Sequence, residues 1–257
     1  MRTQGWALWP ISGPGYHGRV PTRLPSLRRP PIAFAHRGAR AHAPENTLEA
    51  FVLGLKLGAT GLESDAWVTA DGRAVLDHDG LVGGRLRRRP IDQVTRAELP
   101  AHIPELDELY ATCGTGFELS LDVKDAAAVD AVVASAERAG PDAVGRLWLC
   151  HGDLDTLVDW RSRWPGVRLV HSTTTRHLPA GAERHAATLA EHGIDAVNLH
   201  QTEWTGGGVS LYHRFERLAF GWDSQFERIM DELFDSGIDA IYSDHVDRMM
   251  DAWNKLD

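Results

Sequence analysis

The sequence predicts an α/β protein: a single-domain (β/α)8 barrel of the TIM type with a short N-terminal arm. Strand-like and helix-like segments alternate along the chain, which is typical of a parallel sheet. The chain has 257 residues, close to the about 250 that one barrel of this kind needs. No glycine-rich dinucleotide fingerprint follows the first expected strand, which weakens the alternative of an open, doubly wound sheet.

The arm is expected at residues 1–31 and the barrel at residues 32–257. The arm is rich in Pro, Gly and Arg, lacks the apolar core of a secretory signal and ends at Pro30-Pro31. We interpret it as an irregular, extended segment.

Eight apolar, strand-like segments are predicted to form the barrel. They are residues 32–36, 61–67, 117–123, 146–150, 167–171, 195–199, 217–221 and 239–242. Helices are predicted between them at 47–57, 126–139, 153–164, 181–192, 224–236 and 246–253. The first helical segment carries apolar residues at i, i+3, i+4 and i+7, and glycines that follow four of the segments mark helix ends.

The composition limits the classes of partner. A net charge of −9 argues against non-specific binding to nucleic acid or acidic membranes, but a small anionic substrate can still bind a locally cationic site. No segment approaches the length of a transmembrane helix. The two cysteines, Cys113 and Cys150, are too few for a disulfide scaffold and are expected to be free thiols in a reducing compartment. We therefore expect a cytoplasmic protein that acts on a small molecule.

The first functional signal lies at the end of the first strand, and active sites of such barrels lie at the C-terminal ends of the strands. Alternation puts His36 on the same face as apolar residues of that strand, and a histidine in this position is more commonly part of a packed core. Arg37 follows it directly, and arginine is the usual side chain for bidentate phosphate recognition. The pair therefore favours a phosphate site over a core histidine.

Carboxylates follow on the next two strands. Glu63 and Asp65 are two residues apart and share a face, where a hard divalent cation, Mg²⁺ or Ca²⁺, would neutralise their repulsion. On the third strand, Asp122 and Lys124 share the polar face and lie at the C-terminal end. Asp122 is a candidate third metal ligand. Lys124 is a candidate contact to a phosphate oxygen, and an internal ion pair within the barrel is an equally good interpretation of it.

A second histidine is expected to reach the same carboxylates through a tight turn. Asp71-Gly72 lies between apolar alternations and predicts a two-residue hairpin loop. Continuing that register places His78 opposite Asp65, whereas a slip of one residue would put it on the other face. One histidine can then deprotonate the nucleophile while the other protonates the leaving alkoxide. Together with a cation, and with Arg37 and Lys124 on the phosphate, this set suits phosphodiester cleavage.

Further residues extend this pattern over nearly the whole barrel. In order, the pattern consists of His36-Arg37-Gly38, Pro44-Glu45-Asn46-Thr47, Ala50-Phe51, Gly58-Ala59, Glu63, Asp65, Asp71-Gly72, His78-Asp79, Ile103-Pro104-Glu105-Leu106, Asp122-Val123-Lys124, Trp222 and Gly237-Ile238-Asp239-Ala240-Ile241-Tyr242-Ser243-Asp244. It closely resembles the signature of the glycerophosphodiester phosphodiesterase family.

The resemblance implies a role for each matching residue. It implies His36 and His78 as the catalytic pair, Glu63, Asp65 and Asp122 as metal ligands, Arg37 and Lys124 as phosphate contacts, Trp222 as an apolar wall for glycerol, and Glu45 and Asn46 either as supporting site residues or as capping residues. It also implies one divalent cation, Mg²⁺ or Ca²⁺, and hydrolysis of a glycerophosphodiester to glycerol phosphate and an alcohol. In the mechanism that it implies, the neighbouring glycerol hydroxyl attacks phosphorus, and water then opens the cyclic phosphate.

Two departures from the family pattern bear on metal and substrate. Asp122 stands where the family usually has the longer Glu, and Trp222 is followed by Asp223-Ser224-Gln225 instead of Thr-Val-Asn. The alternatives are a phospholipase D-like or lysophospholipid-cleaving enzyme on the same barrel and a non-catalytic glycerophosphodiester-binding barrel. The presence of both His36 and His78 argues against the non-catalytic barrel.

Other polar residues that follow strands or form charge runs are not expected to be catalytic; the histidines among them either line a pocket or cap strands. His151, His171 and His200 each follow a strand, but they match no core motif of the family. The basic run from Arg85 to Arg89 is interpreted as a solvated loop.

Overall fold

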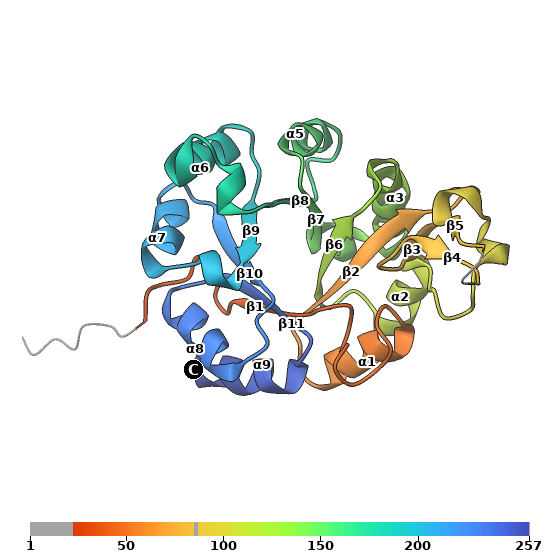
Figure 1. Cartoon of the computed structure of the whole chain (residues 1–257), viewed down its shortest axis with the longest axis horizontal. Helices are drawn as coiled ribbons and strands as arrows, with labels where there is room; N and C mark the ends of the chain where they lie inside the picture. Colours follow the sequence, from red (N-terminus) through yellow and green to blue (C-terminus); the bar gives the residue numbers. More distant parts are fainter. Residues whose placement is uncertain (1–22, 85–86, 257) are drawn as a thin grey trace, which may run out of the picture.

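The computed structural model describes residues 23–84 and 87–256. Within them, eight parallel strands close into a barrel in the order β1-β2-β6-β7-β8-β9-β10-β11, and β1 pairs with both β2 and β11. The strands are β1 (Ile32–Ala35), β2 (Gly61–Val68), β6 (Glu118–Val123), β7 (Leu147–His151), β8 (Arg168–Ser172), β9 (Ala196–His200), β10 (Leu218–Trp222) and β11 (Ala240–Ser243). Helices surround them (Figure 1). The predicted (β/α)8 barrel is therefore confirmed.

Nine α-helices lie in the described part of the chain. They are α1 (Leu48–Lys56), α2 (Leu106–Cys113), α3 (Val129–Ala139), α4 (Pro141–Gly145), α5 (Leu154–Arg163), α6 (Gly181–Glu191), α7 (Gly206–Arg214), α8 (Glu227–Asp235) and α9 (Val246–Trp253). Short 3-10 helices lie at Ile91–Gln93, Arg96–Glu98, Ala126–Ala128, Thr175–His177, Gln201–Glu203 and Asn254–Leu256. None of these α-helices is long and apolar enough to span a bilayer.

Three of the α-helices, α2, α4 and α7, were not predicted. The α7 helix opens with three glycines, whose low helix propensity hides it in the sequence. It forms because the Thr205 side chain accepts a hydrogen bond from the Gly208 amide and because Val209 and Tyr212 are buried. Packing thus outweighs propensity here.

The inside of the barrel is filled by large side chains. Phe34 stacks on Tyr242 with ring centroids 4.7 Å apart, and Trp148 meets Phe220 edge-on at 5.1 Å. These residues form a buried cluster that is separate from the larger layer between strands and helices. The barrel is therefore a packed core with polar side chains left for its mouth.

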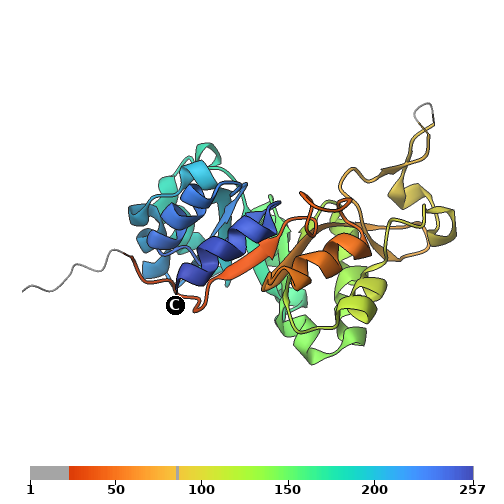
Figure 2. The ribbon, with the colours of Figure 1, turned by 90° about the horizontal axis from the view of Figure 1, so that it is seen from below.

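Residues 69–105, between β2 and α2, project beyond the barrel (Figure 2). This projection contains β3 (Ala74–Leu76), β4 (Leu81–Val82) and β5 (Arg89–Pro90). A small core of its own holds it together, built mainly from Val75, Ile91 and Ile103 with Trp67 packed against it. Because it follows the C-terminal end of β2, this projection stands beside the mouth of the barrel.

The predicted hairpin loop is one residue too short. The Thr69 amide donates to the Arg73 carbonyl at 3.0 Å, so three residues, 70–72, form the loop. Gly72 has φ +77°, the left-handed conformation that a three-residue loop of this kind requires. As a result, the Asp77 amide, and not that of His78, donates to the Asp65 carbonyl. The predicted pairing of Asp65 with His78 is therefore wrong.

Residues 23–31 lie across the opposite, N-terminal end of the barrel and contain no helix or strand. The Ser26 hydroxyl and the Leu27 and Arg28 amides all donate to Asp239 Oδ1, at 2.7–3.0 Å. The Arg28 guanidinium reaches Glu118 inside the barrel at 2.5 Å. Residues 1–22 of the predicted arm, and Arg85 and Leu86 of the basic run, lie outside the described residues.

Candidate active site

A cavity of about 470 Å³ opens at the C-terminal ends of the strands, a size that suits a small ligand. Its lining consists of His36, Arg37, Arg40, Glu63, Asp65, Ser120, Asp122, Lys124, Cys150, Ser172, Asn198, Trp222, Asp223, Gln225, Tyr242 and Asp244. Seven of the ten site residues predicted from the sequence are in this lining. A larger cavity of about 750 Å³ lies at the other end of the barrel, against residues 23–31, but it lacks a comparable set of ionisable groups.

A strained turn after β1 carries the first site residues. Arg37 and Gly38 both have positive φ, +49° and +78°. A Cβ on Gly38 would lie 2.6 Å from the backbone carbon of Ala50 in α1, so only glycine fits there. The turn aims the Arg37 amide at Glu63, to which it donates at 2.9 Å. Strain of this kind is typical of functional sites.

His36 forms a dyad with Asp244, the residue that follows β11. His36 Nδ1 lies 2.6 Å from Asp244 Oδ1, and Nε2 lies 3.8 Å from Glu63 Oε2. Because an ionised carboxylate only accepts hydrogen bonds, Nδ1 carries the proton and Nε2 is the basic atom. Burial lowers the pKa of His36, but the charges of Glu63 and Asp244 outweigh burial and leave the pKa above its usual value. His36 is thus a base with a fixed tautomer.

Three carboxylate side chains and two positively charged side chains line the cavity wall next to this dyad. They are Glu63, Asp65, Asp122, Arg37 and Lys124. Lys124 Nζ lies 3.0 Å from Asp65 Oδ1 and 2.5 Å from Asp122 Oδ2. Burial lowers the pKa of Lys124, but the two aspartates outweigh it and keep the ammonium charged. Arg37 Nε is buried and 3.4 Å from Asp65 Oδ2, without the alignment of a hydrogen bond.

The carboxylates fit a divalent cation by their chemistry. Burial raises the pKa of Glu63, and the negative charge of Asp65 raises it further, so this wall attracts positive charge. Oxygen donors of this kind suit Mg²⁺ or Ca²⁺. Their oxygen atoms are not gathered as tightly as in a ready-made metal site, since among the described residues only His42, His245 and Asp247 place three ligand atoms within 4.8 Å of one another.

Glu45 and Asn46 lie behind this wall and do not line the cavity. Asn46 is buried, accepts from the Ser64 hydroxyl at 2.8 Å and donates to Asp65 at 3.3 Å. Glu45 accepts from Arg37 Nη1 at 3.1 Å. Both therefore hold other site residues in position.

His78 is not brought to the cavity. Its Nδ1 pairs with Asp79 at 2.9 Å, and its side chain is 39% exposed. The three-residue loop described above is the reason, because the one-residue change in register turns Asp77 toward the strand that carries the carboxylates.

The turn after β10 supplies the far wall of the cavity. Trp222 is 39% exposed and meets the His200 ring edge-on at 4.5 Å. His200 Nε2 lies 3.2 Å from Asp223, which has φ +63°. The Asp244 amide donates to Gln225 Oε1 at 3.0 Å, so this turn also supports the dyad.

Known proteins resemble this chain in sequence and in fold. Residues 36–111 match the glycerophosphoryl diester phosphodiesterase family. "Probable glycerophosphodiester phosphodiesterase 2" of Mycobacterium tuberculosis is 28% identical over 252 residues, which cover 86% of this chain and 90% of that protein. The chain thus resembles members of the glycerophosphoryl diester phosphodiesterase family over most of its length. These matches support a phosphoric diester hydrolase, as the sequence motifs predict.

Other members match over a shorter stretch or through the fold alone. Human glycerophosphodiester phosphodiesterase 1 is 39% identical over 98 residues, 32% of this chain and 30% of that protein. The Thermotoga maritima glycerophosphodiester phosphodiesterase aligns with a TM-score of 0.75 at 22% identity over 86% of this chain and 97% of that one. An Oleispira antarctica phosphodiesterase in complex with the product sn-glycerol-3-phosphate aligns with a TM-score of 0.76 at 23% identity over 87% and 97%.

Sequence reasoning did not assign roles to several residues that line the cavity of this phosphodiesterase. Asp244 directly follows β11, so the rule that located His36 could have found it too. Arg40 lies 2.6 Å from Glu45 and 3.6 Å from Asp244, but nothing in its position along the sequence marks it. Cys150 is a buried free thiol in the lining, and burial raises its pKa to about 12.

The three discounted histidines do not line the cavity. His171 Nδ1 lies 2.8 Å from His185 Nε2, and His185 Nδ1 lies 2.8 Å from the Tyr212 hydroxyl. His151 packs its ring against Trp160. His200 lies closest to the site, through its contacts with Trp222 and Asp223.

Proposed function

We propose that the protein hydrolyses glycerophosphodiesters to glycerol phosphate and an alcohol, with one divalent cation, Mg²⁺ or Ca²⁺. The observation that carries the proposal is the His36–Asp244 dyad beside three carboxylates, Arg37 and Lys124 in one small-molecule cavity. The Oleispira antarctica relative, solved with its product sn-glycerol-3-phosphate, supports this substrate class.

His36 is the base in the proposed reaction. Its Nε2 takes the proton of the glycerol hydroxyl next to the phosphate, and that oxygen forms a bond to phosphorus as the bond to the alcohol breaks. Asp244 accepts from Nδ1 and stabilises the imidazolium that forms. Water then opens the cyclic phosphate and regenerates the neutral ring.

Charge on the phosphate is balanced by cationic groups. Arg37 and Lys124 would contact its oxygens. Glu63, Asp65 and Asp122 would hold the cation, and when bound it supplies positive charge to the phosphoryl oxygens. Trp222 would form an apolar wall for the glycerol carbons, while Asn46 and Glu45 would hold Asp65 and Arg37 in place.

The first test is release of glycerol phosphate from glycerophosphocholine by wild-type protein, measured with a coupled assay. We expect EDTA to abolish release and Mg²⁺ or Ca²⁺ to restore it. His36→Ala should reduce kcat/KM by about 10²- to 10⁴-fold, the usual contribution of a positioned base. His192→Ala, which removes the exposed histidine at the C-terminal end of α6, is the matched control. Activity that survives both EDTA and His36→Ala would refute the proposal.

We assign the proton donor to His78 on the family resemblance, although its side chain lies outside the cavity lining. A leaving-group series tests this assignment separately. His78→Ala should slow cleavage of glycerophosphocholine strongly, but should affect a p-nitrophenyl ester little, because nitrophenolate needs no proton to leave. Equal loss on both substrates would remove His78 from this role.

One observation favours the lysophospholipid alternative. Trp222 is 39% exposed and Phe226, four residues later at the start of α8, is 67% exposed. Trp222 lines the cavity and Phe226 directly follows Gln225 of its lining, so the two exposed apolar side chains could accommodate an acyl chain. Lysophosphatidylcholine assayed beside glycerophosphocholine decides between the two, since only lysophospholipid cleavage should fall in Phe226→Ala.

The division into an arm at 1–31 and a barrel at 32–257 is also part of the proposal, as is a cytoplasmic location. The absence of helix or strand in residues 23–31 supports the boundary. Deletion of residues 1–22 should leave the activity unchanged, because the contacts of residues 23–31 to the barrel remain.

A further inference from the structure

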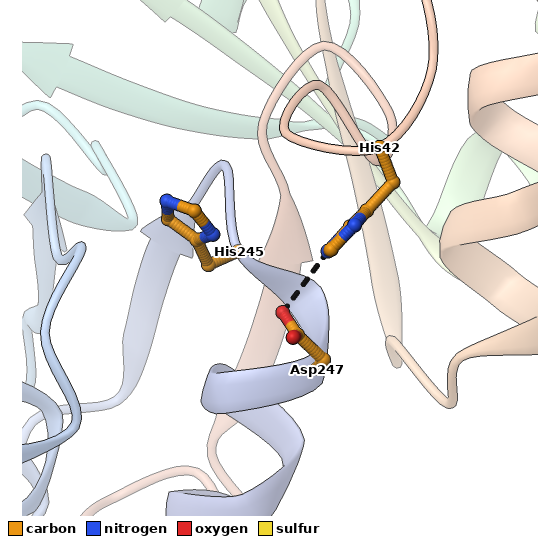
Figure 3. Close-up of side chains that lie close together, drawn as sticks. All are labelled: His42, His245 and Asp247. Atoms are coloured by element: carbon orange, nitrogen blue, oxygen red, sulfur yellow. Dashed lines mark hydrogen bonds and ion pairs between the residues drawn. The ribbon is translucent and has the colours of Figure 1, made fainter.

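A second cluster of metal-ligating side chains lies outside the cavity. His42 is on the loop between β1 and α1, and His245 and Asp247 are at the start of α9. Figure 3 shows His42 pointing from its loop toward Asp247, with the His245 ring beside them. One ligand atom from each side chain lies within 4.8 Å of the other two. No other group of three His, Cys, Asp or Glu residues in the described chain meets this condition.

The backbone positions these three side chains. The Ala41 amide donates to the Asp244 carbonyl at 3.2 Å, which ties the loop to the turn before α9. The His42 amide donates to Ala39 at 2.8 Å and closes the loop on itself. His245 precedes α9, and Asp247 lies in its first turn. The cluster therefore does not depend on long, freely moving side chains.

The donor set differs from that of the cavity. Two imidazoles and one carboxylate suit a first-row divalent ion such as Zn²⁺, whereas three carboxylates suit Mg²⁺ or Ca²⁺. His42 Nε2 lies 3.0 Å from Asp247 Oδ1, so the two ligand atoms already face each other and a cation can take the place of this contact. The side chains of His42 and Asp247 are 34% and 50% exposed, which leaves room for water to complete a tetrahedral shell.

We propose that His42, His245 and Asp247 bind one zinc-class divalent ion. The ion links the loop after β1 to the start of α9. This site is separate from the cavity, and its existence does not depend on the phosphodiesterase reaction.

The link has a consequence for the cavity. The same loop carries Arg37 and Glu45, and His245 is bonded directly to Asp244 of the dyad. An ion between them would hold two walls of the cavity at a fixed separation. It acts as a positioning element and touches no substrate.

Equilibrium dialysis of the full chain against Zn²⁺, with excess Mg²⁺ to compete for the carboxylates of the cavity, tests the site. We expect wild-type protein to bind one equivalent of Zn²⁺. His42→Ala and Asp247→Asn should weaken it by at least about tenfold, because losing even a side chain that only orients a ligand costs about 10- to 100-fold in affinity. Circular dichroism of each variant checks that it is folded.

Two control variants separate this site from other zinc-binding groups. His192→Ala removes an exposed histidine elsewhere and should still bind one equivalent of Zn²⁺. A Glu63→Gln, Asp65→Asn double variant should also bind one equivalent of Zn²⁺. In addition, Zn²⁺ should raise the midpoint temperature of thermal unfolding of this double variant but not that of His42→Ala. Equal Zn²⁺ affinity in wild type and His42→Ala would overturn the proposal. So would loss of the equivalent in the double variant, since the ion would then lie in the cavity.

Discussion

Replacing Asp244 by Asn tests whether the dyad is the catalytic base. The carboxylate accepts a hydrogen bond from His36 Nδ1 at 2.6 Å, and its negative charge helps to raise the pKa of His36. An amide is nearly the same size but has no charge. It can also donate to Nδ1, which would put the ring proton on Nε2, the atom that must accept one.

The magnitude follows from the hydrogen bond that is lost. A bond to a charged group contributes about 1.5–3 kcal/mol. If the transition state loses this amount when the imidazolium forms, kcat/KM falls by about 10- to 160-fold. Because the charge of Asp244 raises the pKa of His36, its removal also shifts the acid limb of the kcat/KM profile to lower pH.

The assay is kcat/KM for glycerophosphocholine as a function of pH, with saturating Mg²⁺. Asp251→Asn, an exposed carboxylate on the same helix that follows Asp244, is the matched control and should leave the profile unchanged. A variant at Asp244 with wild-type activity and an unmoved acid limb would show that His36 does not act as the base through this pair.

Three further predictions concern stability, measured as the free energy of unfolding in urea. Asp239→Ala should lower it by about 3–5 kcal/mol, because buried Asp239 accepts five hydrogen bonds, one of them from His213. His185 has its pKa lowered to about 4 by burial and by His171; the unfolded chain therefore binds more protons below pH 6.5, and up to about 3 kcal/mol of stability is lost as the pH falls from 6.5 toward 4. Gly38→Ala should cost at least about 1–3 kcal/mol through its positive φ alone, and the clash with Ala50 adds to this.

Each of these predictions has its own control. Asp235→Ala removes an exposed partner of Arg23 and should cost less than about 1 kcal/mol. His192→Asn should keep the acid-dependent loss that His185→Asn removes. Gly145→Ala meets no atom within 4 Å and should be tolerated. The interpretations fail if Asp239 behaves like Asp235, if the pH slope survives in His185→Asn, or if Gly38→Ala is as stable as Gly145→Ala.

The barrel could be predicted because its signal is local and repeated. Each strand is a short apolar run bounded by a helix, and the strands found overlap all eight expected segments. The features that could not be predicted from the sequence, the α7 helix and the length of the hairpin loop, depend on tertiary packing. The α7 helix forms despite three glycines because Val209 and Tyr212 are buried, and the hairpin loop takes three residues where Asp71-Gly72 predicts two.

The candidate site was predictable where side chains follow alternation on a strand. Glu63, Asp65 and Asp122 lie in one cavity because their strands are neighbours in the same register, with Asp65 beside Asp122. His78 was misplaced because its position depends on the loop length. The position of Asp244 directly after β11 marks it as a residue of the barrel mouth, but its pairing with His36, 208 residues away, is encoded by no local pattern.

That separation also sets an order of assembly. The two residues of the dyad directly follow the first and last strands, and β1 completes the ring only by pairing with β11. A ribosome adds about 5–20 residues per second, so Asp244 is synthesised roughly 10–40 s after His36. A chain interrupted before that point carries His36, Arg37 and all three carboxylates, yet its histidine has no fixed tautomer. Formation of the proposed catalytic dyad is thus coupled to the last step of barrel closure.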